Sequence, residues 1–396
     1  MIDWGRIDRI DPALGAFTDL DRSAVNGEGP LSSLAIGIKA NIAVRGLPHT
    51  GGMALRRDII ADRDAEVVAR LRSAGAAIVG SLNMHEAALG ATTDNRWFGR
   101  THNPHRSGFT PGGSSGGSGA AVAAGLVDAA LGTDTLGSIR IPASYCGVYG
   151  LKPTHGAVPS DGLVFLARDY DSIGPLARSL DVLEQVWRAI GPPPPAAAPP
   201  FARLVVLDKL ARVEVQPAVR SAYDRALAAI DLPRRTFALE DDPTAIRLAA
   251  LAEVARALIA DLGTDRTQRA DLISPELTFI LGALEAMPLQ PEVLARTRSS
   301  LSAALGEDGV LLLPAAPQVA FAHGGSAPHN QADFTGLANI VGLPAIAIPA
   351  GTDPDGLPIG LQLVGPPHSE DCLIALARHL EPALGGAIPL PQEPHP

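Results

Sequence analysis

The sequence predicts an α/β fold, in which helices cover a sheet of mostly parallel strands. One helix-and-strand unit supports this class: residues 64–74 alternate charged and apolar side chains at helical spacing, and 76–80 form a short apolar strand. Two further apolar runs, at 310–314 and 345–349, have the composition of strands buried on both faces. Strands that alternate with helices imply a parallel sheet packed between helices.

The composition is that of a globular chain and argues against several classes of function. The chain has 396 residues, of which 46% are hydrophobic, enough to bury a sizeable core. A net charge of -10 without a long basic run argues against a nucleic-acid partner. The most apolar window, 337–350, is interrupted by glycine and proline, so we predict a buried strand with turns and no membrane partner.

Cysteine content and the N-terminal residues indicate the cellular compartment. The two cysteines, Cys146 and Cys372, are too few for a disulfide framework. The first six residues do not have the charged-then-apolar order of a signal peptide. We therefore expect a cytoplasmic protein.

Taken in order, the chain divides into three parts of one domain. The first part, residues 1–190, begins with an acidic, irregular stretch at 1–33 and contains the glycine- and serine-rich motifs that indicate chemistry. A proline-rich link at 191–200 opens a shortened insertion of helices and strands, 191–309. Residues 310–396 complete the domain with strands and a last helix. The patterns predict strands at 34–44, 204–207 and 236–239, and helices at 120–131, 217–230, in the region up to 305, and at 370–380.

A run of glycine and serine at 111–119 is the first stretch that indicates chemistry. Glycine permits backbone angles closed to other residues and lets the main chain approach a ligand closely. Because the alanine-rich residues 120–131 follow at once, we expect the loop to present free N–H groups at a helix N-terminus. A flexible linker would have polar flanks, whereas both flanks here are apolar.

Ser114 in this loop could belong to a known motif of another class of hydrolase. The pattern Gly112-x-Ser114-x-Gly116 fits the nucleophile elbow of α/β-hydrolases, which would make Ser114 the nucleophile. That motif needs a strand directly before the turn, but residues 103–108 have the composition of a loop.

A second loop, 132–142, contains Ser138 between two apolar segments, so its backbone should be held rigidly. A serine hydroxyl is a poor nucleophile unless a base lies within hydrogen-bond reach and amides face the developing oxyanion. Lys39, which interrupts the apolar run 34–44, is a candidate base because burial lowers the pKa of lysine. Periodicity alone favours a different interpretation, in which Lys39 extends from an edge strand to water.

The histidines of the sequence indicate neither a catalytic acid-base pair nor a metal site. His85 and Glu86 resemble an acid-base pair, but we interpret them as a capping and surface pair at a helix start. His102 and His105 have no cysteine or third histidine at ligand spacing, so no metal is predicted.

The ordered motifs together resemble the amidase signature family of serine hydrolases. The resemblance is strong over about residues 34–190, good over 310–380 and loose between them. It implies the amidase signature fold, a large, mixed, mostly parallel β-sheet sandwiched between α-helices. The similar blocks are Gly37-Ile38-Lys39, the segments 112–118, 132–140, 146–154 and 171–179, and, near the end, Asn339, 342–345 and 356–363.

The resemblance also implies a role for each residue of the motifs. Ser138 is the nucleophile, Ser114 is a bridging serine after a cis Gly113-Ser114 peptide bond, and Lys39 is the base. Neutral Lys39 would take a proton from Ser114, which takes one from Ser138 as it attacks the carbonyl. The oxyanion hole consists of the backbone N–H groups of Thr135, Leu136, Gly137 and Ser138. This relay requires no cofactor.

Three residues around the nucleophile receive structural interpretations. Asp134 and Arg140 are charged residues in an apolar region, so we expect them to pair and brace the loop. Arg140 could alternatively hold a substrate carboxylate. Leu136 stands where the family usually has glycine, and we hypothesise that it narrows the acyl pocket and selects slender substrates.

The predicted function is hydrolysis of a small-molecule amide through an acyl-enzyme on Ser138, releasing ammonia or an amine. One alternative is the catalytic subunit of an amidotransferase or of a biuret-type hydrolase complex that needs a small accessory protein. Another is a non-catalytic scaffold with this fold, which the presence of all three of Lys39, Ser114 and Ser138 argues against. Homodimers are common in the family, so a homodimer is also possible.

Overall fold

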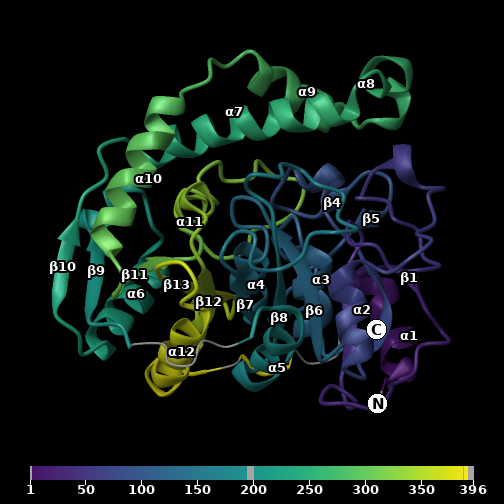
Figure 1. Cartoon of the computed structure of the whole chain (residues 1–396), viewed down its shortest axis with the longest axis horizontal. Coiled ribbons are helices and arrows are strands. Elements are labelled where there is room, and N and C mark those ends of the chain that lie inside the picture. Colours follow the sequence, from purple (N-terminus) through teal and green to yellow (C-terminus); the bar gives the residue numbers. More distant parts are fainter. Residues whose placement is uncertain (1, 194–199, 387, 391–396) are drawn as a thin grey trace.

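A computed structural model describes residues 2–193, 200–386 and 388–390, and its centre is one large sheet (Figure 1). Within the described residues the sheet has 11 strands. Its strands are β1 Phe17–Leu20, β2 Ala35–Lys39, β3 Ala77–Leu82, β6 Ala129–Asp134, β7 Tyr149–Lys152, β8 Ser172–Ala177, β9 Arg203–Leu207, β10 Arg234–Phe237, β11 Gly309–Pro314, β12 Ala345–Thr352 and β13 Pro358–Val364. A separate small pair consists of β4 Asp94–Asn95 and β5 Gly99–Arg100.

The strand order is β1-β3-β2-β6-β8-β7-β12-β13-β11-β9-β10. Pairing is parallel from β3 through β2 to β6, and again from β11 through β9 to β10. The strands between these groups pair antiparallel, as does the edge strand β1. The sheet is therefore mixed. The parallel pair β2 and β6 carries both candidate catalytic segments to the same edge of the sheet.

Helices pack on both faces of the sheet, and this confirms the predicted α/β class. Side chains alternate along each strand, and at β3 this separates two apolar clusters: Ile78 belongs to the first and Val79 to the second. Helices α1 and α3 pack with the second cluster, α2, α5, α6 and α12 pack with the first, and α4 contributes to both. The helices are α1 Trp4–Leu14, α2 Glu66–Ser73, α3 Gly116–Ala123, α4 Arg140–Cys146, α5 Leu180–Ile190, α6 Pro217–Ala229, α7 Pro243–Leu262, α8 Asp265–Gln268, α9 Pro275–Glu285, α10 Pro291–Leu305, α11 Gly336–Val341 and α12 Glu370–Leu384.

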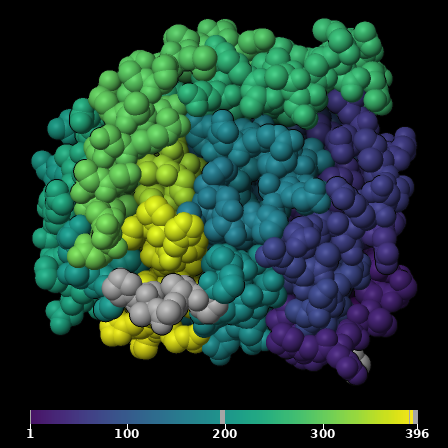
Figure 2. Space-filling view, viewed as in Figure 1, coloured from purple at the N-terminus to yellow at the C-terminus, as the bar shows by residue number. Residues whose placement is uncertain are grey.

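The middle of the chain is divided between the sheet and a helical arch. Strands β9 and β10 extend the sheet, while α7 to α10 run across one end of it (Figure 1). In the space-filling view this green segment forms the upper rim and meets the purple N-terminal part at the right (Figure 2). Buried contacts hold the arch down, among them Arg247 Nε to Asp333 Oδ1 at 2.6 Å. The division of the chain at residues 190 and 309 stays a prediction.

Several predicted elements need correction. The stretch 1–33 is not irregular, because α1 and β1 form within it. The predicted helix 120–131 is two elements, α3 and β6, since Gly125 at φ 66° ends the helical turn and the next residues pair with neighbouring strands. In the window 337–350 the strand β12 follows a short helix, α11. Most of the proline-rich link at 191–200 lies outside the described residues.

Candidate active site

Lys39 ends strand β2 with its side chain fully buried beside two hydroxyl groups. Its Nζ lies 2.7 Å from Ser114 Oγ and 2.7 Å from Thr133 Oγ1. Strand β2 pairs in parallel with β6, which brings Thr133 next to Lys39, although the two residues are far apart in sequence. The alternative in which Lys39 extends to water is therefore wrong.

Burial controls the charge of Lys39. Removal from water lowers the pKa of its ammonium group to about 7, although the negative charges of Asp171 and Asp134 act in the opposite direction. A neutral amine has one lone pair and two N–H groups, so it can accept a proton from Ser114 while it donates to Thr133. Lys39 thus has the geometry and the basicity of a proton acceptor near neutral pH.

The glycine-serine loop is fixed in place by close contacts with the main chain of residues 85–92. The Gly113-Ser114 peptide bond is cis, as the resemblance implies. A Cβ at Gly113 would lie 2.8 Å from the backbone of Ala91 and Thr92, so only glycine fits there. The carbonyl of Ser114 accepts a hydrogen bond from the N–H of His85 at 3.1 Å. Ser114 therefore has a defined position beside Lys39.

The segment before this loop does not support a nucleophile elbow at Ser114. Between residues 103 and 111 the described structure has only isolated bridges, Asn103 with Arg106 and Phe109 with Ala322, and no named strand.

Ser138 lies in the turn between β6 and α4, next to the glycine-serine loop. The N–H of Ser115 donates to the carbonyl of Ser138 at 3.2 Å, so the two loops meet at their main chains. Ser138 is half-buried, whereas Ser114 is buried. Among the described residues no hydrogen bond joins the two serine hydroxyls. Ser138 is therefore partly accessible to solvent, whereas Ser114 and Lys39 are fully buried.

The four amides predicted for an oxyanion hole are not equivalent. The N–H of Gly137 donates to Asp134 Oδ1 at 2.7 Å, so it already has an acceptor. For the N–H groups of Thr135, Leu136 and Ser138 no acceptor is found within the part of the chain that the structure describes. Three of the four groups are therefore free to face a ligand.

Asp134 and Arg140 form a fully buried ion pair beneath the nucleophile loop. Arg140 Nη2 lies 2.9 Å from Asp134 Oδ1, and its Nε lies 3.1 Å from Oδ2. The remaining guanidinium hydrogens donate to the Thr335 carbonyl, Gln362 Oε1 and Asn339 Oδ1 at 2.9, 2.7 and 2.6 Å. Arginine has five N–H donors, and all five are used within the protein. Arg140 therefore braces the loop and has no donor left for a substrate carboxylate.

The carboxylate of Asp134 fixes the turn itself. It accepts the N–H groups of Gly137 and Ile139, and it also accepts from Asn339 Nδ2. Although burial opposes ionisation, the adjacent Arg140 and the hydrogen bonds bring the pKa of Asp134 down to about 2. Asp134 is therefore ionised across the physiological range.

Leu136 fits this loop without an unusual backbone angle, since it is not among the residues with positive φ. Its side chain is 8% exposed and lies against Gly336 of α11, where a Cβ would meet it at 3.7 Å. The position that requires glycine is Gly137, with φ 135° and a Cβ that would lie 2.2 Å from Thr335 Oγ1.

Three polar residues near Lys39 were not predicted to have a role. Thr133 contacts Lys39, and Asn41 Nδ2 donates to the same Thr133 hydroxyl at 3.2 Å. Asp171 Oδ1 accepts from the hydroxyl of Thr135 at 2.5 Å. Burial raises the pKa of Asp171 to about 6. The sequence signal for these residues was weak: Thr133 and Asp171 lie within the blocks that resemble the family, and Asn41 follows Lys39 by two residues.

His85 and Glu86 are not a surface pair, because both are buried. Glu86 Oε1 accepts from Trp97 Nε1 at 2.8 Å and from the N–H of Ser274, just before α9, at 3.2 Å. His85 Nε2 lies 3.8 Å from Glu276 of α9. The pair therefore fastens the helical arch to the core.

The two histidines that were considered for a metal site, His102 and His105, have structural contacts. His105 Nε2 is 2.9 Å from the carbonyl of Cys146, and the ring of His102 packs edge-on against His323. Among the described residues, no group of three or more side chains is arranged to hold a metal ion. The same residues include no helix long and apolar enough to cross a membrane.

The fold and the buried lysine-serine pair define a class, an α/β enzyme that acts on carbon-nitrogen amide bonds. The chain belongs to the Amidase family, whose sequence profile matches residues 10–199 and 273–374. The resemblance found in the motifs is thereby confirmed.

The relatives are similar over nearly their whole length. The A subunit of the glutamyl-tRNA(Gln) amidotransferase of Thermus thermophilus is 35% identical, with 96% of this chain and 92% of the relative covered. A structure described as a vestigial protein complex that reveals the evolutionary origins of an s-triazine catabolic enzyme, with inhibitor bound, is 30% identical with a TM-score of 0.88, covering 97% of this chain and 94% of the other. The structure of the amidotransferase A subunit from Thermotoga maritima is 27% identical, with a TM-score of 0.84 and coverage of 99% and 93%.

Proposed function

We propose that the chain is the amide-cleaving catalytic subunit of a complex, using Ser138 as nucleophile and Ser114 and Lys39 as proton relay. The observation that carries this proposal is the 2.7 Å contact between Lys39 Nζ and Ser114 Oγ, in a setting that lowers the pKa of the amine to about 7, so that a large fraction is neutral near pH 7. A lysine with these neighbours has a chemical use that a purely structural lysine lacks.

The reaction would proceed in two balanced halves. In the first, the Ser138 oxygen forms a bond to the amide carbon, and its proton passes through Ser114 to Lys39. The free N–H groups of Thr135, Leu136 and Ser138 would stabilise the oxyanion. The carbon-nitrogen bond then breaks, and the proton returns through the relay to the leaving nitrogen. In the second half, water attacks the ester by the same relay and frees the carboxylic acid.

The relatives favour a partner-dependent enzyme over the stand-alone amidase that the sequence first suggests. The Thermus relative is by name one subunit of an amidotransferase, and the vestigial s-triazine structure is by description a complex. We therefore propose a partner protein for this chain, a small-molecule amide as the molecule that is cleaved, and a cytoplasmic location. A homodimer is compatible with the same proposal.

Ammonia release tests the two versions. The purified chain alone, and the chain isolated from its own cells with its bound partners, would be offered glutamine, asparagine and short primary amides. Turnover only in the second preparation would support the partner-dependent enzyme. Equal turnover in both would favour the stand-alone amidase, and activity that survived Ser138→Ala would overturn the mechanism.

Leu136 supplies a smaller test of the acyl side of the site. If its side chain narrows the acyl pocket, Leu136→Gly should raise kcat/KM for branched relative to linear acyl groups by about tenfold, the effect of one or two methylene groups. An unchanged ratio in a variant that keeps its melting temperature would remove the hypothesis.

A further inference from the structure

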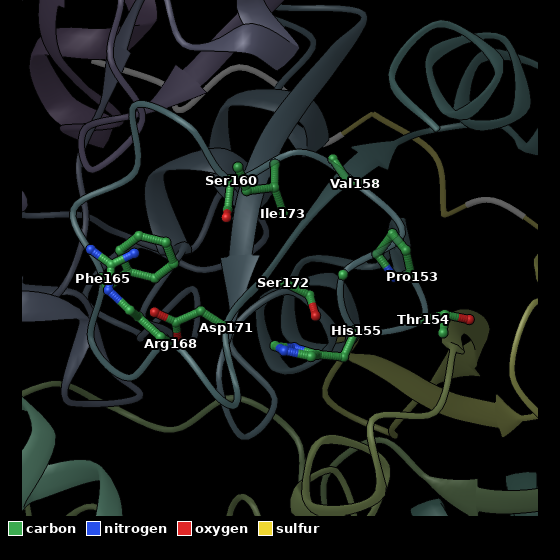
Figure 3. A pocket seen from close by; sticks show the side chains of 11 residues that line it. Pro153, Thr154, His155, Val158, Ser160, Phe165, Arg168, Asp171, Ser172 and Ile173 are labelled. Atoms are coloured by element: carbon green, nitrogen blue, oxygen red, sulfur yellow. The ribbon is translucent and has the colours of Figure 1, made fainter. Parts of the chain in front are cut away.

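A pocket of about 120 Å³ lies between the end of β7 and the start of β8 (Figure 3). Its lining includes His155, Val158, Phe165, Arg168, Asp171 and Ser172. In Figure 3, Phe165 and Arg168 lie together on one side, and Pro153 and Thr154 lie on the opposite side. The pocket accommodates several non-hydrogen atoms, enough for a carboxylate on a short chain.

This pocket adjoins both halves of the candidate active site. Asp171 in its wall accepts the hydroxyl of Thr135, which precedes Ser138 in the nucleophile loop. The loop that forms the pocket also contacts the turn that follows β2, since the N–H of Val164 donates to the carbonyl of Asn41 at 2.8 Å. The pocket is therefore separated from the loop that carries Ser138 by the side chains of Asp171 and Thr135.

The charges around the pocket favour an anion. The guanidinium carbon of Arg168 lies 4.0 Å from the centre of the Phe165 ring, which holds the cation without neutralising it. No ion pair involving Arg168 is found among the described residues. His155 is mostly uncharged at neutral pH, because burial lowers its pKa. Arg168 is thus the permanent positive charge of the lining.

Asp171 and Asp169 are the acidic groups that a bound carboxylate would meet. Both oxygens of Asp171 are used, Oδ1 by Thr135 and Oδ2 by the N–H groups of Leu166 and Ala167. These donors screen its charge from the pocket. Arg168 and Asp169 are both exposed, so water weakens the effect of each charge.

We propose that Arg168, positioned on the Phe165 ring, binds a carboxylate of the substrate, so that the enzyme prefers amides carrying a second, acidic group a few atoms from the reacting carbonyl. This inference rests on the proposed function and adds a substrate class to it. The competing explanation is that Arg168 only covers the apolar ring.

The test compares charged and neutral amides of matched length. Malonamate, succinamate and glutaramate would each be assayed beside the neutral amide of the same carbon number, with the wild type, Arg168→Gln and Arg168→Lys. Arg378→Gln is the control, since Arg378 is an exposed arginine on α12.

The wild type should prefer one amic acid. Arg168→Gln should lower kcat/KM for it by about 10- to 100-fold, mainly through KM, because a hydrogen bond to a charged group is lost. Arg168→Lys should lose less, and the neutral amide should change less than about twofold.

A binding measurement separates this proposal from the proposed function. Calorimetry of succinamate with Ser138→Ala, and with Ser138→Ala combined with Arg168→Gln, needs no turnover. Weaker binding in the double variant, at an unchanged melting temperature, would support the pocket even if no amide were hydrolysed. Equal binding by both proteins, or equal kcat/KM for charged and neutral amides at every length, would overturn it while leaving the hydrolytic mechanism intact.

Discussion

The surroundings of two buried lysines, Lys39 and Lys152, differ in a way that pKa values alone do not reveal. Both side chains are inaccessible to solvent, and burial brings both pKa values to about 7. Lys39 contacts two side-chain hydroxyls, those of Ser114 and Thr133. Lys152 donates to the main-chain carbonyl of Pro153 at 2.7 Å and lies 3.5 Å from Ser172 Oγ. Each lysine thus has a serine hydroxyl nearby, at 2.7 Å for Lys39 and at 3.5 Å for Lys152. A perturbed pKa therefore marks a candidate base only where the proton to be transferred lies within close hydrogen-bond reach.

The strongest test of this difference removes each lysine in turn. Lys39→Ala should lower kcat by roughly 10²- to 10⁴-fold, because the general base is lost. Lys152→Met, which keeps the volume but removes the charge, should change kcat less than about tenfold and act mainly on stability. Rates would be measured on protein whose circular dichroism matches the wild type. Similar losses of kcat in the two variants would contradict the distinction.

The second test concerns Asp134, whose charge acts on both lysines. Asp134→Asn should destabilise the protein by about 3–5 kcal/mol, since it leaves the buried Arg140 without its counter-ion. The control is Asp181→Asn in the exposed pair with Arg378, which should cost less than about 1 kcal/mol. Urea unfolding measures both. A loss in Asp134→Asn no greater than in the control would show that the remaining acceptors suffice for Arg140.

A smaller effect on kcat is expected from removing the hydroxyl groups of Thr133 and Ser172, which contact Lys39 and Lys152. Thr133→Val removes an acceptor of Lys39 at nearly constant volume, and kcat should fall about five- to tenfold, as for one hydrogen bond of about 1 kcal/mol. Ser172→Ala is the matched change beside Lys152 and should leave kcat unaltered. The comparison fails if the serine variant loses as much activity as the threonine variant.

The smallest expected change is a shift in pH dependence. If neutral Lys39 is the base, as proposed, kcat/KM should rise with pH through about 7 and level off above it. Lys152→Met should move the midpoint of the kcat/KM pH profile by less than roughly half a pH unit, since charges separated by intervening protein groups interact weakly. A pH-rate profile for each protein decides this. A profile that falls through pH 7 would mean that the charged amine is the active form.

The sequence predicted those features that depend on local pattern. The apolar runs identified β3, β11 and β12, and the spacing of apolar residues identified α6. Helix α1 was missed because acidic residues and Pro12 obscured its apolar positions at Ile7, Ile10 and Leu14. The strand β6 was assigned to a helix from its alanine content, which pairing with β2 and β8 overrides.

Within the site, the sequence indicated Lys39, Ser114 and Ser138 and the pairing of Asp134 with Arg140. It did not indicate the hydroxyl and amide groups that contact them. Thr133 reaches Lys39 only through the register of β2 and β6, and Gly137 is engaged by Asp134 only because the turn bends back on itself. Such contacts depend on tertiary geometry, which no single stretch of sequence contains.

The network around Arg140 also has a consequence for how the protein is made. Its partners Thr335, Asn339 and Gln362 are between 195 and 222 residues further along the chain. During synthesis the nucleophile loop leaves the ribosome long before these acceptors exist. A nascent chain would therefore carry a formed glycine-serine loop and an unanchored Ser138, and the reactive centre would assemble only after nearly the whole polypeptide had been released.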